Sequence, residues 1–327
     1  MKPFNVFPYD SNFDFMRLRW ISLAIAGLLM VASFAAMIFH AFNGGFDPGR
    51  TFNFALDFTG GSVVELRFDR PVDTDAVRNR LDAAGFHGAQ VQGLGSGREL
   101  MVRLQPQEGS QGATAKDRTA AAVVQAASLP GNAAHVQRSD FVGPQVGKEL
   151  AWKSLYAFLF VLVGLLIYIS MRFELKFALG AIIATIHDVS IVAGWFAITR
   201  HEFDLTVLAG LLAVMGFSIN DTIVVFDRVR ENFRSMRLSP REIMNKAINQ
   251  TLSRTVIVSF VAFLSMLALY VFGGASLRGL AEAQIIGTVI GTLSSIFIAC
   301  PLLLWFGVSK QDLMPKAKDE AALARRP

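Results

Sequence analysis

The chain has 327 residues, of which 53% are hydrophobic, and it carries a formal net charge of +5. Its apolar residues recur in runs of about 20, each long enough to cross a bilayer as a helix, so a soluble protein is disfavoured. The basic residues lie at the ends of these runs, where they orient a membrane protein, and this placement argues against nucleic-acid binding. The single cysteine, Cys300, excludes an intrachain disulfide and a cysteine-based metal site.

The apolar runs predict six transmembrane helices between an N-terminal segment of residues 1–19 and a tail of residues 308–327. The first run is longer than the ~7–15 apolar residues of a secretory signal peptide, so we expect an uncleaved span. The predicted spans cover residues 20–41, 150–171, 177–198, 205–226, 253–272 and 281–307.

Charge asymmetry predicts the orientation of these spans. Most basic residues between spans fall on one side, above all in residues 227–252, whereas the short loops of the other side carry only Arg200 and Arg278. Because cytoplasmic loops are enriched in Lys and Arg, we expect a multi-pass protein with both termini in the cytoplasm. The long loop of residues 42–149, between the first two spans, is then extracytoplasmic.

The long loop carries the pattern of a small α+β domain. Apolar and polar residues alternate where strands are expected, and two segments have helical spacing. The order β-α-β-β-α-β predicts a ferredoxin-like fold. The predicted elements are strand 62–68, helix 74–85, strands 89–94 and 99–105, helix 114–128 and strand 134–142, with a glycine-rich turn at 95–97 and a polar loop at 105–112.

A helix start stands out between the fourth and fifth spans. Ser239 is followed by Pro240 and, three residues after the serine, by Glu242, which is the pattern of a capping box with proline in the first turn. The pattern predicts a short amphipathic helix leading into the fifth span.

Three polar groups lie inside predicted spans: His187-Asp188, Asn220-Asp221 and Arg254. An ionised carboxylate at mid-bilayer costs about 2.5–3.5 kcal/mol, so it needs compensation. Asp221 lies roughly 9 Å inside the cytoplasmic boundary, and Arg254 enters from the same side in the next span. If the two side chains meet and separate as helices move, the carboxyl group binds and releases a proton. The plainer alternative is that Arg254 extends to the headgroups while Asp221 hydrogen-bonds to a neighbouring helix.

Small residues in the spans indicate close helix packing. Gly287 and Gly291 form a small-xxx-small pair in the sixth span, and Gly216 lies in the fourth. An alternative role is to let the helices slide. The sequence has no P-loop, nucleophile elbow or metal-ligand spacing, so we expect no enzymatic activity, no metal and no cofactor.

Several short segments stand out along the chain: LDFTGG at 56–61, VGPQVG at 142–147, RFE at 172–174, His187-Asp188, GFSIND at 216–221 and DRVREN at 227–232. Together and in this order, they resemble the SecF family of bacterial protein-export membrane subunits, within the resistance-nodulation-division superfamily. One departure is Phe217, where this family more often has tyrosine.

The resemblance implies a subunit that pairs with a homologous six-span SecD to form a twelve-helix, pseudo-symmetric unit in the bacterial inner membrane. That unit lies beside the SecYEG channel, with YajC and YidC as further candidate partners, and uses the proton gradient to draw unfolded polypeptide into the periplasm. Asp221 and Arg254 match the proton path of the family, beside which Asn220 and Asp188 lie. The implied conformational joint before the outer domain comprises Asp57, Phe58, Thr59, Gly60 and Gly61.

Two other functions are compatible with the predicted spans. The first is a half-transporter of a small molecule or lipid that acts as a homodimer. The second is a passive assembly scaffold, in which the intramembrane carboxylates have no role in transport.

Overall fold

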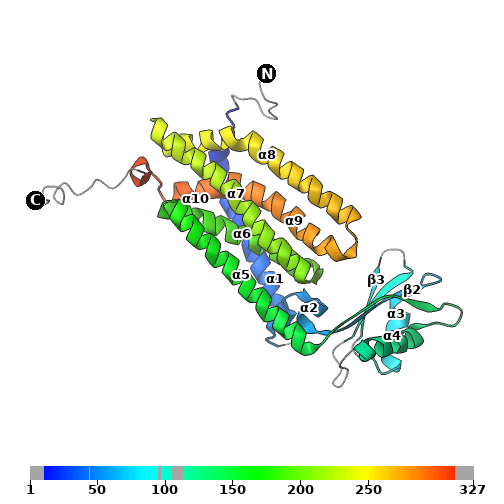
Figure 1. Ribbon diagram of the computed structural model, residues 1–327. Coiled ribbons are helices and arrows are strands. Elements are labelled where there is room, and N and C mark those ends of the chain that lie inside the picture. The colour runs from blue at the N-terminus through cyan, green and yellow to red at the C-terminus, as the bar shows by residue number, and fades with distance from the viewer. Residues whose placement is uncertain (1–10, 44, 88, 95–96, 105–112, 314–327) are drawn as a thin grey trace, which may run out of the picture. The chain divides into compact units, whose positions relative to one another are not determined.

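The computed structural model describes residues 11–313 except residues 44, 88, 95–96 and 105–112. The chain groups into two compact units, one formed by residues 1–53 with 158–327 and the other by residues 54–157 (Figure 1). Residues 42–53 therefore group with the helices, and the predicted outer domain starts later in the chain. The centre of the predicted glycine-rich turn, the polar loop and the end of the tail lie outside the described residues.

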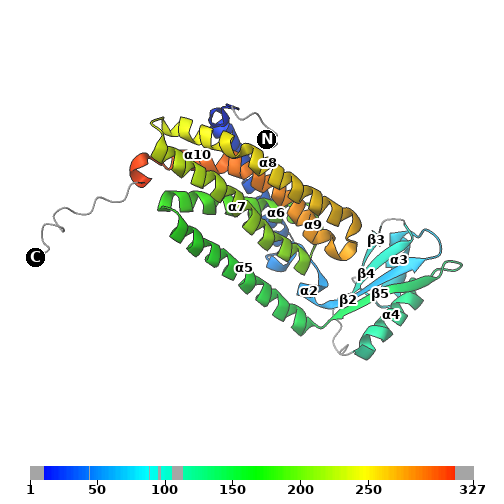
Figure 2. The same cartoon turned by 45° about the horizontal axis from the view of Figure 1, so that its top comes forward.

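Six helices in the described part of the chain are long and apolar enough to cross a membrane, which confirms the predicted number. Figures 1 and 2 show α6, α7, α8 and α9 running alongside one another. The sixth span is continuous through a five-residue π-helix, η3. The elements are α1 (Arg19–Phe42), α5 (Pro144–Arg172), α6 (Leu175–Thr199), α7 (Leu205–Ser235), α8 (Pro240–Phe272), α9 (Ala275–Ser294), η3 (Ser295–Ala299) and α10 (Cys300–Trp305).

The helices extend beyond the predicted spans. The segment of residues 227–252 forms the end of α7 and the start of α8, joined by a short turn. At that turn Ser239 Oγ accepts a hydrogen bond from the Glu242 amide, and Glu242 Oε2 accepts one from the Ser239 amide, which confirms the capping box. The expectation of a separate amphipathic helix is wrong, because no glycine or proline interrupts residues 241–272 and the helix continues into the fifth span.

The helical unit has inner and outer helices. Half or more of the residues in the most apolar stretches of α6, α7 and the α9–α10 span are buried, against 11% in α1, α5 and α8. Aromatic rings fill part of the centre, where Phe177 and Phe226 meet edge to face with centroids 5.4 Å apart. The inner helices therefore form the core of this unit, and the outer helices present apolar surface to lipid or to a partner.

The second unit contains a four-stranded antiparallel sheet in the order β3-β4-β2-β5. Val64, Leu66 and Phe68 alternate inward along β2, and their core includes Val77 and Leu81 of α3. The element order and strand order are those of a ferredoxin-like fold, as predicted. The elements are β2 (Gly61–Phe68), α3 (Thr74–Ala83), β3 (Gln90–Leu94), β4 (Glu99–Leu104), α4 (Ala113–Ala127) and β5 (Ala134–Val142).

Candidate functional site

Asp221 lies in the interior of the helical unit and is 3% exposed. Its Oδ2 atom accepts a hydrogen bond of 3.3 Å from Ser259 Oγ on α8. Thr292 Oγ1, on α9, lies 2.7 Å from the same serine oxygen. A chain of three polar side chains therefore joins α7, α8 and α9 around one buried carboxyl group.

Arg254 does not form the ion pair that depth alone suggested. Its side chain is exposed, whereas its neighbours Thr255 and Ser259 on α8 are buried. Successive residues of an α-helix point about 100° apart, so an inward Thr255 turns Arg254 outward. Among the described residues no carboxylate pairs with Arg254, although it interacts electrostatically with Asp221 at longer range. The alternative in which Asp221 hydrogen-bonds to a neighbouring helix is the arrangement observed.

Asn220 and Gly216 share an outward face of α7, one helical turn apart, and both are exposed. A methyl group added at Gly216 would meet no described atom within 4 Å. The expectation that Gly216 packs helices together is therefore wrong within this subunit, because its face of α7 is turned away from the inner helices. An exposed amide in the middle of a span is costly in lipid, so this face needs a polar or protein neighbour.

Asp188 forms a second buried polar cluster, on α6. Its Oδ2 atom accepts hydrogen bonds from Ser218 Oγ on α7 at 2.5 Å and from Ser294 Oγ on α9 at 2.6 Å. Its Oδ1 atom lies 2.8 Å from His187 Nδ1. Asp188 is fully buried, and the cluster ties together the three inner helices.

The two serines of the Asp188 cluster were missed by sequence reasoning. Ser218 lies three residues before Asp221 and Ser294 three residues after Gly291, so both are within one turn of residues that the sequence had marked. That spacing is the available signal, but small hydroxyl residues are common in spans and their partners lie on other helices.

Two glycines of α9 bring it close to α7. A Cβ atom at Gly287 would overlap Val214, and one at Gly291 would lie 3.3 Å from Ser218 Cβ and 3.7 Å from Asp188 Oδ2. Close approach at Gly291 therefore holds Ser218 and Ser294 around the carboxylate.

The predicted joint forms a tight turn at the start of the sheet unit. Asp57, Phe58 and Thr59 lie in α2 (Leu56–Thr59), and the amide of Gly60 donates to Leu56 O over 2.8 Å. Gly60 and Gly61 have φ angles of 70° and 119°, which side chains rarely allow.

Two contacts hold this turn. A Cβ atom at Gly147, in the first turn of α5, would lie 2.7 Å from the Gly60 nitrogen, so helix and turn touch backbone to backbone. Arg103 Nη1 donates to Phe54 O over 2.8 Å. Burial lowers the pKa of Arg103, and the negative charge of Asp57 opposes that shift.

Replacing Gly60 by alanine is expected to destabilise the sheet unit by about 1–3 kcal/mol, because its φ of 70° and ψ of 177° lie in a region that is essentially restricted to glycine. Limited proteolysis of the full chain, comparing cleavage rates of residues 54–157, measures this loss. Gly143→Ala is the matched control, since no described atom lies within 4 Å of its added methyl group. Equal cleavage rates in both variants would show that the turn carries no strain.

Family models match two parts of the chain. "Protein export membrane protein SecD/SecF, C-terminal" matches residues 123–309, and "SecD/SecF GG Motif" matches residues 48–72. The second match includes the turn at Gly60 and Gly61, and the first includes both buried carboxylates.

Curated relatives match along nearly the whole chain. The protein translocase subunit SecF of Vibrio alginolyticus is 42% identical over 95% of both chains. The SecF of Escherichia coli O157:H7 is 40% identical over 95% of this chain and 93% of its own. The crystal structure of SecDF from Thermus thermophilus, described as a translocon-associated membrane protein, is 34% identical with a TM-score of 0.77. The match includes 92% of this chain but only 40% of the longer SecDF chain.

Proposed function

This chain belongs to the SecF family of protein-translocase subunits, and on that premise we propose that it works with a SecD partner to drive polypeptide export with the proton gradient. In this role it is an accessory subunit of the Sec translocase and carries out no catalytic step. The coupling group is Asp221, and the moving part is the sheet unit, which turns about the joint at Gly60 and Gly61.

The observation that carries the proposal is a buried carboxyl group whose hydrogen-bond partner, the only one among the described residues, suits both of its protonation states. The Ser259 hydroxyl donates to Asp221 in the structure, and a hydroxyl also accepts from a protonated carboxylic acid. Ser259 lies on α8 and Thr292 on α9, so a change in the proton bound at Asp221 alters contacts among three helices. One charge that crosses 100 mV supplies about 2.3 kcal/mol, which is enough to shift such contacts.

Exposed polar groups on α7 and α8 support the inference that a membrane-spanning partner packs against these helices. Asn220 and Arg254 lie on the surface of this subunit at positions where lipid would be unfavourable. Helices of a SecD homologue that pack there would cover both groups and bring Arg254 into the shared interior. The solved SecDF structure, of which this chain matches 40%, is consistent with such a larger unit.

We infer the orientation of the chain in the membrane from the distribution of its basic residues. We place both termini in the cytoplasm and the sheet unit in the periplasm, where it meets unfolded polypeptide as this leaves the SecYEG channel. YajC and YidC are further candidate partners of the assembled unit, and the bilayer surrounds the outer helices.

Affinity purification in mild detergent tests the partnership. The wild-type chain is expected to co-purify with a second six-span homologue, and Asn220→Trp is expected to lower the yield of that partner about tenfold, since one bulky clash at an interface costs about 1.4 kcal/mol or more. The control is Leu28→Trp on α1, a residue that is 69% exposed. Recovery of a self-dimer without the homologue would instead support the half-transporter.

A further inference from the structure

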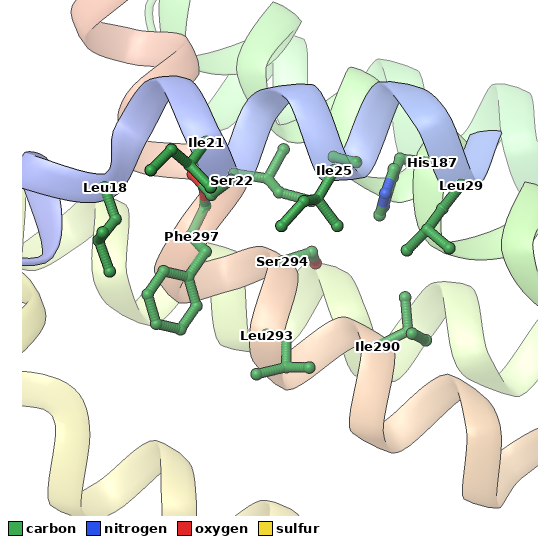
Figure 3. A pocket seen from close by; sticks show the side chains of 12 residues that line it. Leu18, Ile21, Ser22, Ile25, Leu29, His187, Ile290, Leu293, Ser294 and Phe297 are labelled. Atoms are coloured by element: carbon green, nitrogen blue, oxygen red, sulfur yellow. The ribbon is translucent and has the colours of Figure 1, made fainter. Parts of the chain in front are cut away.

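An apolar cavity of about 290 Å³ lies between α1, α6 and the α9–η3 segment of the helical unit (Figure 3). Ile25 and Leu29 of α1 line one side, and Leu293 and Phe297 line the other. The volume is close to the lower limit of about 300 Å³ for small-molecule sites. Ile25 is 53% exposed, so the cavity opens at the surface of the helical unit.

One polar atom in the wall of this cavity has no hydrogen-bond partner in the described part of the chain. The His187 side chain is 7% exposed, its Nδ1 atom is bound to Asp188, and its Nε2 atom is buried without a hydrogen bond among the described residues. The two serines of the lining are committed elsewhere: Ser22 Oγ donates to Phe297 O over 2.7 Å, and Ser294 Oγ donates to Asp188. A buried polar atom left unpaired costs about 1–3 kcal/mol, so Nε2 favours a ligand that pairs with it.

The wall of the cavity has an unusual backbone. The π-helix η3 (Ser295–Ala299) contributes Phe297, whose carbonyl is capped by Ser22 from α1. Single-turn π-helical segments inside α-helices are rare and occur frequently at functional sites. The irregular turn, the cavity and the unpaired imidazole nitrogen therefore coincide.

We propose that this cavity binds an amphiphile from the bilayer that carries one hydroxyl group at the end of an apolar chain. A hydroxyl donates and accepts, so it pairs with His187 Nε2 in either tautomer of the ring. Water fits less well, because the lining is apolar apart from His187 and two serine hydroxyls whose protons are already donated, whereas a buried water needs two to four polar partners. No Lys or Arg lines the cavity, so a charged headgroup has no counter-ion there.

Photolabelling of the full chain in lipid nanodiscs tests this site. The probe is a ten-carbon alcohol with a diazirine on its chain, and the matched control is the methyl ether of the same compound. The alcohol is expected to label the cavity-lining residues of α1 and α9 about fivefold more than the ether, the ratio that one hydrogen bond of ordinary net strength provides. Unlabelled 1-decanol is expected to compete, and decane is not.

Two variants distinguish recognition of the hydroxyl group by His187 from nonspecific occupation of the apolar cavity. His187→Phe removes the polar atom, and labelling by alcohol and ether should become equal. Ile25→Trp fills the cavity, leaves the His187–Asp188 contact in place and should abolish labelling by both probes, whereas Leu28→Trp, one turn away and 69% exposed, should not. Equal labelling of the wild type by both probes, or labelling that Ile25→Trp leaves unchanged, would overturn the proposal.

Discussion

An Asp221→Asn variant is expected to lose the proton-driven part of polypeptide export while its folding and partner binding persist. Asparagine has nearly the same size, and its carbonyl oxygen still accepts from Ser259, so the contacts around the site survive. It cannot bind or release a proton at pH 7, so the ~2.3 kcal/mol available per charge from 100 mV is no longer coupled to helix contacts. Export into membrane vesicles that contain this chain and its partner, measured with and without an uncoupler, gives the proton-dependent fraction directly.

The matched control is Asp227→Asn, six residues further along α7. Asp227 pairs with Arg172 over 2.9 Å, and both side chains are more than 40% exposed. Exposed ion pairs contribute about 0–1 kcal/mol, so this variant should export normally. Full proton-driven export by Asp221→Asn would rule out Asp221 as the coupling group and would favour the passive scaffold. If the homologue still co-purified in that case, the partnership would stand without the proton step.

The number of spans and the ferredoxin-like order were predictable because each depends on local sequence. The length of an apolar run is enough to predict a membrane helix. The alternation of apolar residues such as Val64 and Leu66 with polar ones predicts a strand with one buried face. Ser239 and Glu242 fixed the start of α8 because a capping box is complete within four residues.

The rotation of each helix about its own axis was not predictable from a single sequence. Depth along the helices placed Asp221 and Arg254 near each other, but a change of one residue turns a side chain by about 100°, and Arg254 faces outward. The partners of Asp188 are hydroxyl groups from two other helices, so no local pattern reveals them. In a span that is apolar nearly all round, the hydrophobic pattern does not mark which face is buried.

A Gly287→Ala variant is expected to destabilise the packing of α7 against α9. The added methyl group would overlap Val214, which is fully buried, so the two helices must separate. Overpacking of this kind typically costs about 1–3 kcal/mol. Because α7 and α9 carry Ser218, Ser294 and the chain from Asp221 to Thr292, their separation should also reduce proton-driven export. Thermal unfolding of the purified chain and the vesicle assay measure the two effects.

A second substitution decides whether the effect comes from that overlap. Val214→Ala alone leaves a cavity and destabilises, but combined with Gly287→Ala it makes room for the new methyl group. The double variant should therefore lose less unfolding free energy than the two single variants lose together. The expected difference is the ~0.5–3 kcal/mol typical of residues in contact. Gly164→Ala on α5 is the control, because its methyl group would meet no described atom within 4 Å. Additive losses in the double variant would mean that α9 tolerates the methyl group by moving elsewhere, and close contact at Gly287 would then not set the spacing of the inner helices.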